Sequence, residues 1–234
     1  MKNIYLSFLL CLVFVLLSVL NCKTKQPYEN NKYVKLRSNY QQIDDFKKIK
    51  DTILKYNFYD KRKNKTGNFK GRFKEQKIEN NVVILDFRTK LMWMTQEKNA
   101  LSWTKENLDW FTPVLYKDAE SKIANLNKKS GYAGYRDWRM PTIEEAASLL
   151  RKQKNSKSLF LPDVFSIKQK NKPLKNTIIL YIWTGDYYNR NVLNKKNMIW
   201  TISFSAGGIF KESNSNPQYI RLVRTFKTKT KTKT

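Results

Sequence analysis

The sequence predicts an α+β domain in which two helices pack on short antiparallel sheets. Three observations support this fold class: β-type runs lie at both ends of residues 79–226, helical periodicity is confined to two stretches between them, and no internal repeat is present. Helices embedded among antiparallel strands form an α+β domain. A region of about 150 residues is also long enough to bury a normal hydrophobic core.

The first elements of this domain are a hairpin and a helix. Residues 82–85 and 91–94 are β-type runs separated by a short turn, and this spacing predicts a hairpin. In residues 116–128, apolar side chains such as Ile123 and Leu126 recur on one side, which predicts an amphipathic helix.

The centre of the domain is residues 131–150, which combine a turn, an aromatic-basic cluster and a second helix. Thr142 can cap this helix, and Glu145, three positions later, can cap it in return. Pro141 keeps the residue before it extended and marks the boundary. Ile143 and the apolar residues after it repeat at helical spacing.

The aromatic-basic cluster before this helix is Asp137-Trp138-Arg139. A tryptophan among charged neighbours in a tight loop is more often part of the core, where its neighbours satisfy backbone polar groups. We interpret this motif, with Pro141, as mainly structural. The same interpretation covers tryptophan and arginine residues of the expected strands, namely Trp93, Trp183, Trp200 and Arg224.

Three strands are expected to close the domain. Residues 178–183 are strongly β-type, and residues 200–204 alternate apolar and polar side chains with the period of a half-buried strand. Residues 206–208 predict a turn, and residues 219–223 predict the last strand.

The start of the chain predicts export. Residues 1–21 contain a short basic region and an apolar run, which suit a signal peptide. Cys22 follows this run in a sequence similar to a lipobox, although Asn21 replaces the usual small residue. We expect cleavage before Cys22 and lipidation of its sulfur; an uncleaved N-terminal anchor is the alternative. The residue after Cys22 is Lys23 rather than the Asp that signals inner-membrane retention in some bacteria. This favours the outer membrane, on its periplasmic or surface face.

Two segments flank the expected domain. Residues 22–78 are polar and basic, and they predict a partly disordered tether with one modest helix over residues 44–56. The alternative is a basic strip that contacts lipid head groups or the cell envelope. Order is expected from about Glu79. Residues 227–234 form a Lys-Thr tail of low complexity.

The net charge of +27 favours polyanions as partners, because 46 basic residues face only 19 acidic ones. The alternative is a lysine-rich composition that reflects an AT-rich genome. Export argues against nucleic acid as the partner.

The chain contains no histidine, which removes the commonest general base and metal ligand. Its two cysteines, Cys11 in the signal and the lipidated Cys22, leave no pair for a disulfide.

Several of these segments together resemble the Lcl C-terminal domain, the C-terminal domain of the Legionella collagen-like protein. The resemblance covers roughly residues 79–226, and its most specific part is the central motif of residues 134–141. Supporting segments occur in the same order, at residues 86–93, 119–126, 149–150, 181–184, 200–204, 207 and 220–224.

The resemblance implies a fold related to C-type lectin-like domains, a superfamily shared with the formylglycine-generating enzyme. It also implies an exported protein, often a lipoprotein, and the namesake adhesin binds sulfated glycosaminoglycans. The sequence departs from the family pattern at Lys90, where glycine is usual, and at Leu222, where cysteine is frequent.

These observations favour a non-enzymatic surface module that binds an acidic polysaccharide, such as a glycosaminoglycan, or another polyanion. Arginine pairs bidentately with sulfate or carboxylate, and loops on a rigid scaffold commonly carry recognition. The expected contact site is the exposed segment of residues 185–197, which could equally be a plain hairpin loop. The candidate ligand-binding residues are Tyr187, Tyr188, Arg190, Lys195, Lys196 and Arg136.

Other functions find less support in the sequence. The chemistry of the formylglycine-generating relative needs cysteines that this domain lacks. Glu144 and Glu145 are adjacent on a helix and do not face each other. Asp163 and Asp186 are isolated, so a calcium site is not expected, nor is any other metal or cofactor. A structural envelope protein with a protein partner remains an alternative.

Overall fold

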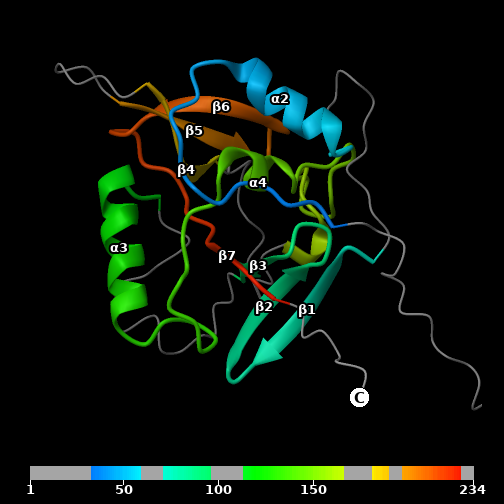
Figure 1. The fold of residues 1–234 in the computed structure, drawn as a ribbon, viewed down its shortest axis with the longest axis vertical. Coiled ribbons are helices and arrows are strands. Elements are labelled where there is room, and N and C mark those ends of the chain that lie inside the picture. Colours follow the sequence, from blue (N-terminus) through cyan, green and yellow to red (C-terminus); the bar gives the residue numbers. More distant parts are fainter. Residues whose placement is uncertain (1–32, 59–70, 96–112, 166–180, 190–196, 228–234) are drawn as a thin grey trace, which may run out of the picture. The chain divides into compact units, whose positions relative to one another are not determined.

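The computed structural model describes residues 33–58, 71–95, 113–165, 181–189 and 197–227 (Figure 1). The chain divides into two compact units, residues 1–32 and 33–234, and every described residue belongs to the second. Helices and two antiparallel sheets confirm the α+β prediction. The helices are α2 (Phe46–Lys55), α3 (Tyr116–Lys128), α4 (Ile143–Ala147) and the 3-10 helix η3 (Asp163–Phe165). The strands are β1 (Phe73–Ile78), β2 (Asn81–Asp86), β3 (Leu91–Met94), β4 (Tyr181–Asn189), β5 (Met198–Ser203), β6 (Gly208–Ser213) and β7 (Val223–Thr225).

The first sheet has the strand order β1-β2-β3-β7 and contains the predicted hairpin of residues 82–94. Asp86 pairs with Leu91 at its closed end. Lys90 in this turn has a φ of 57°, a left-handed conformation that glycine adopts most easily. The glycine that is usual in the family at this position therefore matches the backbone, and this chain forms the turn without it.

The second sheet has the strand order β4-β5-β6. β4 begins at Tyr181, since the first predicted strand residues lie outside the described part, and it runs to Asn189. The predicted turn is present, with Gly207 at a φ of 70°. The last strand forms at Val223–Thr225 rather than at residues 219–223, because Tyr219 pairs separately with β4, where it bonds to the backbones of Tyr181 and Trp183.

The two predicted helices of the domain are present. α3 spans Tyr116–Lys128, as expected. α4 has the predicted capping box between Thr142 and Glu145 but contains only five residues. Its C-cap is Ser148, whose hydroxyl donates to the carbonyl of Glu145 and whose carbonyl accepts from Arg72. α4 contacts α2, β4 and β5 (Figure 1).

The prediction of a tether over residues 22–78 is wrong for its described parts. The helix expected over residues 44–56 forms as α2, with Asp45 as its N-cap. The buried apolar side chains of this segment belong to the main core cluster, namely Val34, Leu36, Ile43, Ile49, Ile53 and Phe58. Their spacing is too sparse to predict burial. Some of their partners are also distant in the chain, as in the bond from the Trp200 indole to the Ile43 carbonyl.

β1 also lies within the predicted tether, and a buried ion pair fixes its start. The guanidinium of Arg72 donates to both Asp86 oxygens, at 2.8 and 2.5 Å, and also to Ser148. Both charged side chains are fully buried. Asp86 further accepts from the backbone N–H groups of Arg88 and Thr89. This ion pair joins the β2–β3 turn to the end of α4.

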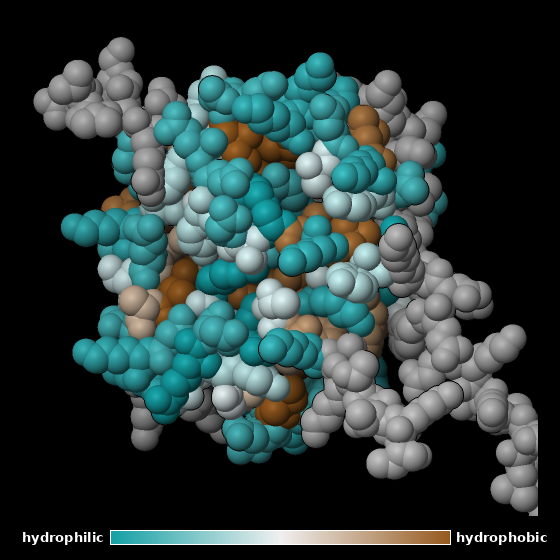
Figure 2. All heavy atoms as spheres, in the orientation of Figure 1, coloured by the Kyte–Doolittle hydropathy of each residue, from teal (hydrophilic) through white to brown (hydrophobic). Residues whose placement is uncertain are grey.

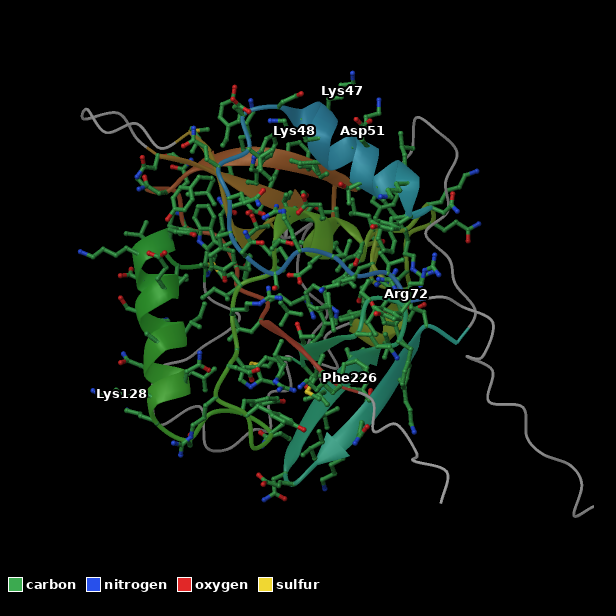
Figure 3. All side chains as sticks on the ribbon, in the orientation of Figure 1. Lys47, Lys48, Asp51, Arg72, Lys128 and Phe226 are labelled. Carbon is green, nitrogen blue, oxygen red and sulfur yellow. The ribbon has the colours of Figure 1, made fainter. Side chains whose placement is uncertain are left out.

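We predict that Arg72→Met destabilises the protein by about 3–5 kcal/mol, because it leaves the Asp86 carboxylate buried without its guanidinium. Urea unfolding followed by tryptophan fluorescence measures this loss. Lys48→Met is the control, since Lys48 of α2 (labelled in Figure 3) pairs with Asp44 at 3.7 Å and both side chains are more than two-thirds exposed. The control should change stability by at most about 0.5 kcal/mol. Equal effects of the two substitutions would contradict the prediction.

Candidate functional site

The predicted contact segment of residues 185–197 begins as a strand, because β4 continues to Asn189. Gly185 and Asp186 are buried, and Tyr187 and Tyr188 are half-buried. The prediction of an exposed loop is therefore wrong for residues 185–188. Strand alternation turns the two tyrosines to opposite core clusters.

Both tyrosine rings are engaged within the fold. The Tyr187 ring packs against Tyr116, with centroids 5.6 Å apart. The Tyr188 ring packs edge-on against Trp200, with centroids 5.5 Å apart, and the Lys211 ammonium lies 3.6 Å from the Tyr188 centroid. A ligand would have to displace these neighbours to stack on either ring.

The structure places one of the predicted basic contacts. Arg136 is exposed, beside the turn at Gly131. Arg190, Lys195 and Lys196 lie outside the described residues, as does the predicted lipidation site Cys22. These four remain predictions.

The central motif is held by hydrogen bonds within the core. The Trp138 indole donates to the carbonyl of Tyr132 at 2.9 Å, and the Trp138 backbone exchanges two bonds with the side chain of Asn127. Arg139 donates to both oxygens of Glu145 at 2.7 Å. These contacts are those of a scaffold rather than of an open site.

The remaining motif residues also pack within the fold. Arg224 donates to Asp137 at 2.6 Å, and its guanidinium lies 3.7 Å from the ring centroid of Tyr135. Pro141 accepts a bond from the Gly185 backbone. The strand tryptophans Trp93, Trp183 and Trp200 are all at most 2% exposed.

A basic loop lies on the surface at residues 151–157. Its three lysines, Lys152, Lys154 and Lys157, are exposed. Backbone bonds fix its shape, with Arg151 donating to Phe160 and Asn155 donating to Leu159. The Lys154 ammonium lies 5.3 Å from the Phe160 ring centroid. We call residues 151–157 the basic loop.

The basic loop contains four basic residues, Arg151, Lys152, Lys154 and Lys157. Burial, and then the charge of Arg72, lower the pKa of Arg151 to about 10, while Asp86 and Asp163 partly offset this effect. Asp163 is itself engaged by Ser156, which donates its backbone N–H and its hydroxyl to the carboxylate. An anion bound near Arg151 would stabilise its charged form and so raise its pKa again.

A second polar site joins the N-terminal segment to the domain at Arg37. Its guanidinium donates to both oxygens of Asp186, at 2.6 Å each, to both oxygens of Glu144, and to the carbonyl of Asn39. All five N–H groups of the guanidinium are used. Asp186 also accepts from the backbone N–H groups of Gln41 and Ile143.

The charges of this site depend on one another. Burial opposes the charge of Arg37, but bonds and charges of Asp186 and Glu144 outweigh it and raise the Arg37 pKa. Burial raises the pKa of Glu144, against the effect of Arg37. This site could not be predicted from local sequence patterns, because Arg37 is 107 residues from Glu144 and 149 from Asp186. The available signal was an arginine in a segment where lysine predominates.

The buried acidic side chains of the described part all pair with arginines. Glu144 and Glu145 point to different arginines, Arg37 and Arg139. Among the described residues, no group of three histidine, cysteine, aspartate or glutamate side chains could hold a metal ion. None of the helices in the described part is long and apolar enough to span a membrane.

Comparison with known families matches residues 82–224 to the Lcl C-terminal domain. The chain belongs to this family. Comparisons with curated proteins and with solved structures gave no match. The matched Lcl C-terminal domain includes Asp86, Glu144 and Asp186 but neither Arg37 nor Arg72. In this chain, residues before the matched range therefore neutralise three buried acids of the Lcl C-terminal domain.

We predict that Tyr40 makes stability depend on alkaline pH. Its hydroxyl donates to the Met140 carbonyl at 3.0 Å. Burial raises the pKa of Tyr40 to about 12, with Glu145 and Asp186 adding to the effect of burial and Arg139 opposing it. Because this value exceeds the ordinary one of about 10, the stabilising contribution is complete below pH 10 and is lost as the pH rises towards 12.

Urea unfolding of the wild type and of Tyr40→Phe between pH 8 and pH 11.5 tests this prediction. The wild type should be the more stable protein at pH 8, and its advantage should shrink steadily above pH 10, because the tyrosine ionises in the unfolded chain while the folded protein still holds Tyr40 protonated. Lysine titration affects both proteins alike, so it cancels when the unfolding free energy of Tyr40→Phe is subtracted from that of the wild type. A difference that stays constant over this range would contradict the assignment.

Proposed function

We propose that this protein is a non-enzymatic binding module of the bacterial cell envelope, anchored by a lipid at Cys22, that binds sulfated or otherwise acidic glycans. This proposal rests mainly on the basic loop. It presents three exposed lysines beside Arg151, whose charge burial and Arg72 disfavour. Guanidinium and ammonium groups in such a setting bind sulfate or carboxylate groups favourably.

The distribution of charge supports this proposal. The four buried acids of the described part, Asp86, Glu144, Glu145 and Asp186, each pair with an arginine of the fold. The exposed lysines are therefore not consumed by the buried acids. Figure 2 shows a face that is mostly hydrophilic, with separate apolar areas, which suits a polar partner better than a broad apolar one.

Family and sequence add support from another direction. The resemblance to a glycosaminoglycan-binding adhesin favours a sulfated ligand. The lack of histidine and the placement of the only two cysteines in or next to the signal favour binding over catalysis. The lipid anchor and the envelope location rest on the signal-like residues 1–21 and on Cys22.

We predict that the full chain is retained on heparin and on dextran sulfate but not on neutral dextran. Lys152→Glu/Lys154→Glu/Lys157→Glu should lower the salt concentration needed for elution. It should also reduce the slope of log affinity against log salt by about two to three, because each lost ion contact releases fewer counterions. Retention on heparin columns and titrations over a salt series measure both effects.

The matched control is Lys74→Glu/Lys77→Glu/Lys117→Glu, which changes the net charge equally at exposed positions of β1 and α3. It should retain most of the affinity. Equal losses in both triple variants would reduce the effect to net charge alone. If heparin affinity falls only in Lys195→Glu/Lys196→Glu, or only after deletion of residues 228–234, the binding site lies in that segment and not in the basic loop. Absence of retention at low salt would refute the proposal.

A further inference from the structure

Residues 37–43 lie against the domain in the manner of a bound peptide. Gln42 pairs in parallel with Tyr187 of β4, which is an edge strand of its sheet. The Ile43 N–H donates to the Tyr187 carbonyl at 2.8 Å, and the Tyr187 N–H donates to the Gln41 carbonyl at 3.0 Å. Addition of an extended segment to a sheet edge is a common mode of peptide recognition.

One side chain of this segment enters an acidic pocket. Arg37 lies between Glu144 of α4 and Asp186 of β4, and it donates to all four carboxylate oxygens. Glu144 is 7% exposed and Asp186 is fully buried. Bidentate pairing with two carboxylates requires a planar guanidinium, which lysine cannot replace.

A second side chain, that of Tyr40, is 41% exposed and lies across Gly185; we call this place the glycine-floored slot. A Cβ atom added at Gly185 would lie only 2.0 Å from the Tyr40 ring, so this ring rests directly on the strand backbone. The Tyr40 hydroxyl reaches the Met140 carbonyl at the end of the slot. The absence of a side chain at Gly185 is therefore what admits the aromatic ring.

We infer that the outer edge of β4 and the start of α4 form a peptide-binding groove that recognises an extended Arg-x-x-Tyr segment, occupied in this chain by its own residues 37–43. The pocket selects arginine and the glycine-floored slot selects tyrosine, while the strand edge holds the backbone that follows them, at residues 41–43. The same segment from a second copy of the chain has the chemistry to enter once the resident segment leaves.

The groove is independent of polyanion binding. Its ligand segment, residues 37–43, carries the cation Arg37 and no acidic side chain, so it offers the basic loop no anionic group to bind. Heparin retention and peptide binding can therefore fail separately. The resident segment has a high effective concentration, so a peptide added in trans competes only after the resident contacts are weakened.

The test uses a fluorescent synthetic peptide of residues 33–45 and the full chain with Arg37→Ala/Tyr40→Ala. This variant should bind the peptide at least tenfold more tightly than the wild type, as measured by fluorescence anisotropy. A peptide with lysine in place of Arg37, or a chain that also carries Asp186→Asn, should bind about tenfold more weakly than the unaltered pair. Ser38→Ala/Asn39→Ala is the matched control chain, because the described contacts of this segment do not use these side chains, and it should behave as the wild type.

Loss of Arg37 leaves two buried carboxylates, so circular dichroism first checks that the double variant is folded. Arg37→Lys keeps a positive charge in the pocket and serves if the double variant unfolds; its peptide affinity should lie above that of the wild type. A folded variant that does not bind the peptide at millimolar concentration would overturn the inference. Binding that is unchanged by the lysine-substituted peptide and by Asp186→Asn would also overturn it.

Discussion

Neutralisation of buried carboxylates is the constraint on which this fold depends. Asp86 and Asp186 are fully buried, and such groups are stable only when paired and saturated with hydrogen bonds. Arg72 and Arg37 provide those pairs from residues outside the matched Lcl C-terminal domain. The functional unit of this chain therefore begins at least as early as Arg37, and a fragment that starts at the family boundary would contain buried acids without their partners.

Local interactions explain what the sequence could predict. The capping box links Thr142 to Glu145, three residues apart, and the turn at residues 86–91 closes a hairpin between adjacent strands. α3 and α2 have apolar residues at helical spacing, so their formation was predictable as well. In each case the interacting groups lie within about one helical turn or one hairpin, where periodicity and capping carry the information.

Distant interactions explain what the sequence could not predict. The assignment of residues 33–58 to a tether followed from their polarity, yet their few apolar residues are buried by partners far along the chain, such as Trp200. Tyr187 and Tyr188 resembled exposed loop aromatics because neither the length of β4 nor the packing of their rings is encoded locally. Net charge counts arginine and lysine alike, so composition could not predict that several arginines would form buried ion pairs while the lysines of the basic loop stay exposed.

Under the proposed function, the arginines serve the structure and the surface lysines serve binding. Arg37, Arg72 and Arg139 have side chains that are at least three-quarters buried, and their bidentate pairs within the fold are weakly screened by salt. The lysines of the basic loop stay in water, where salt screens them strongly. Under the proposed function, ionic strength would weaken binding at the surface lysines while the arginine-carboxylate pairs keep the fold in place. Planar guanidinium groups thus perform the structural task, which requires fixed geometry, and the surface lysines are left for the proposed binding.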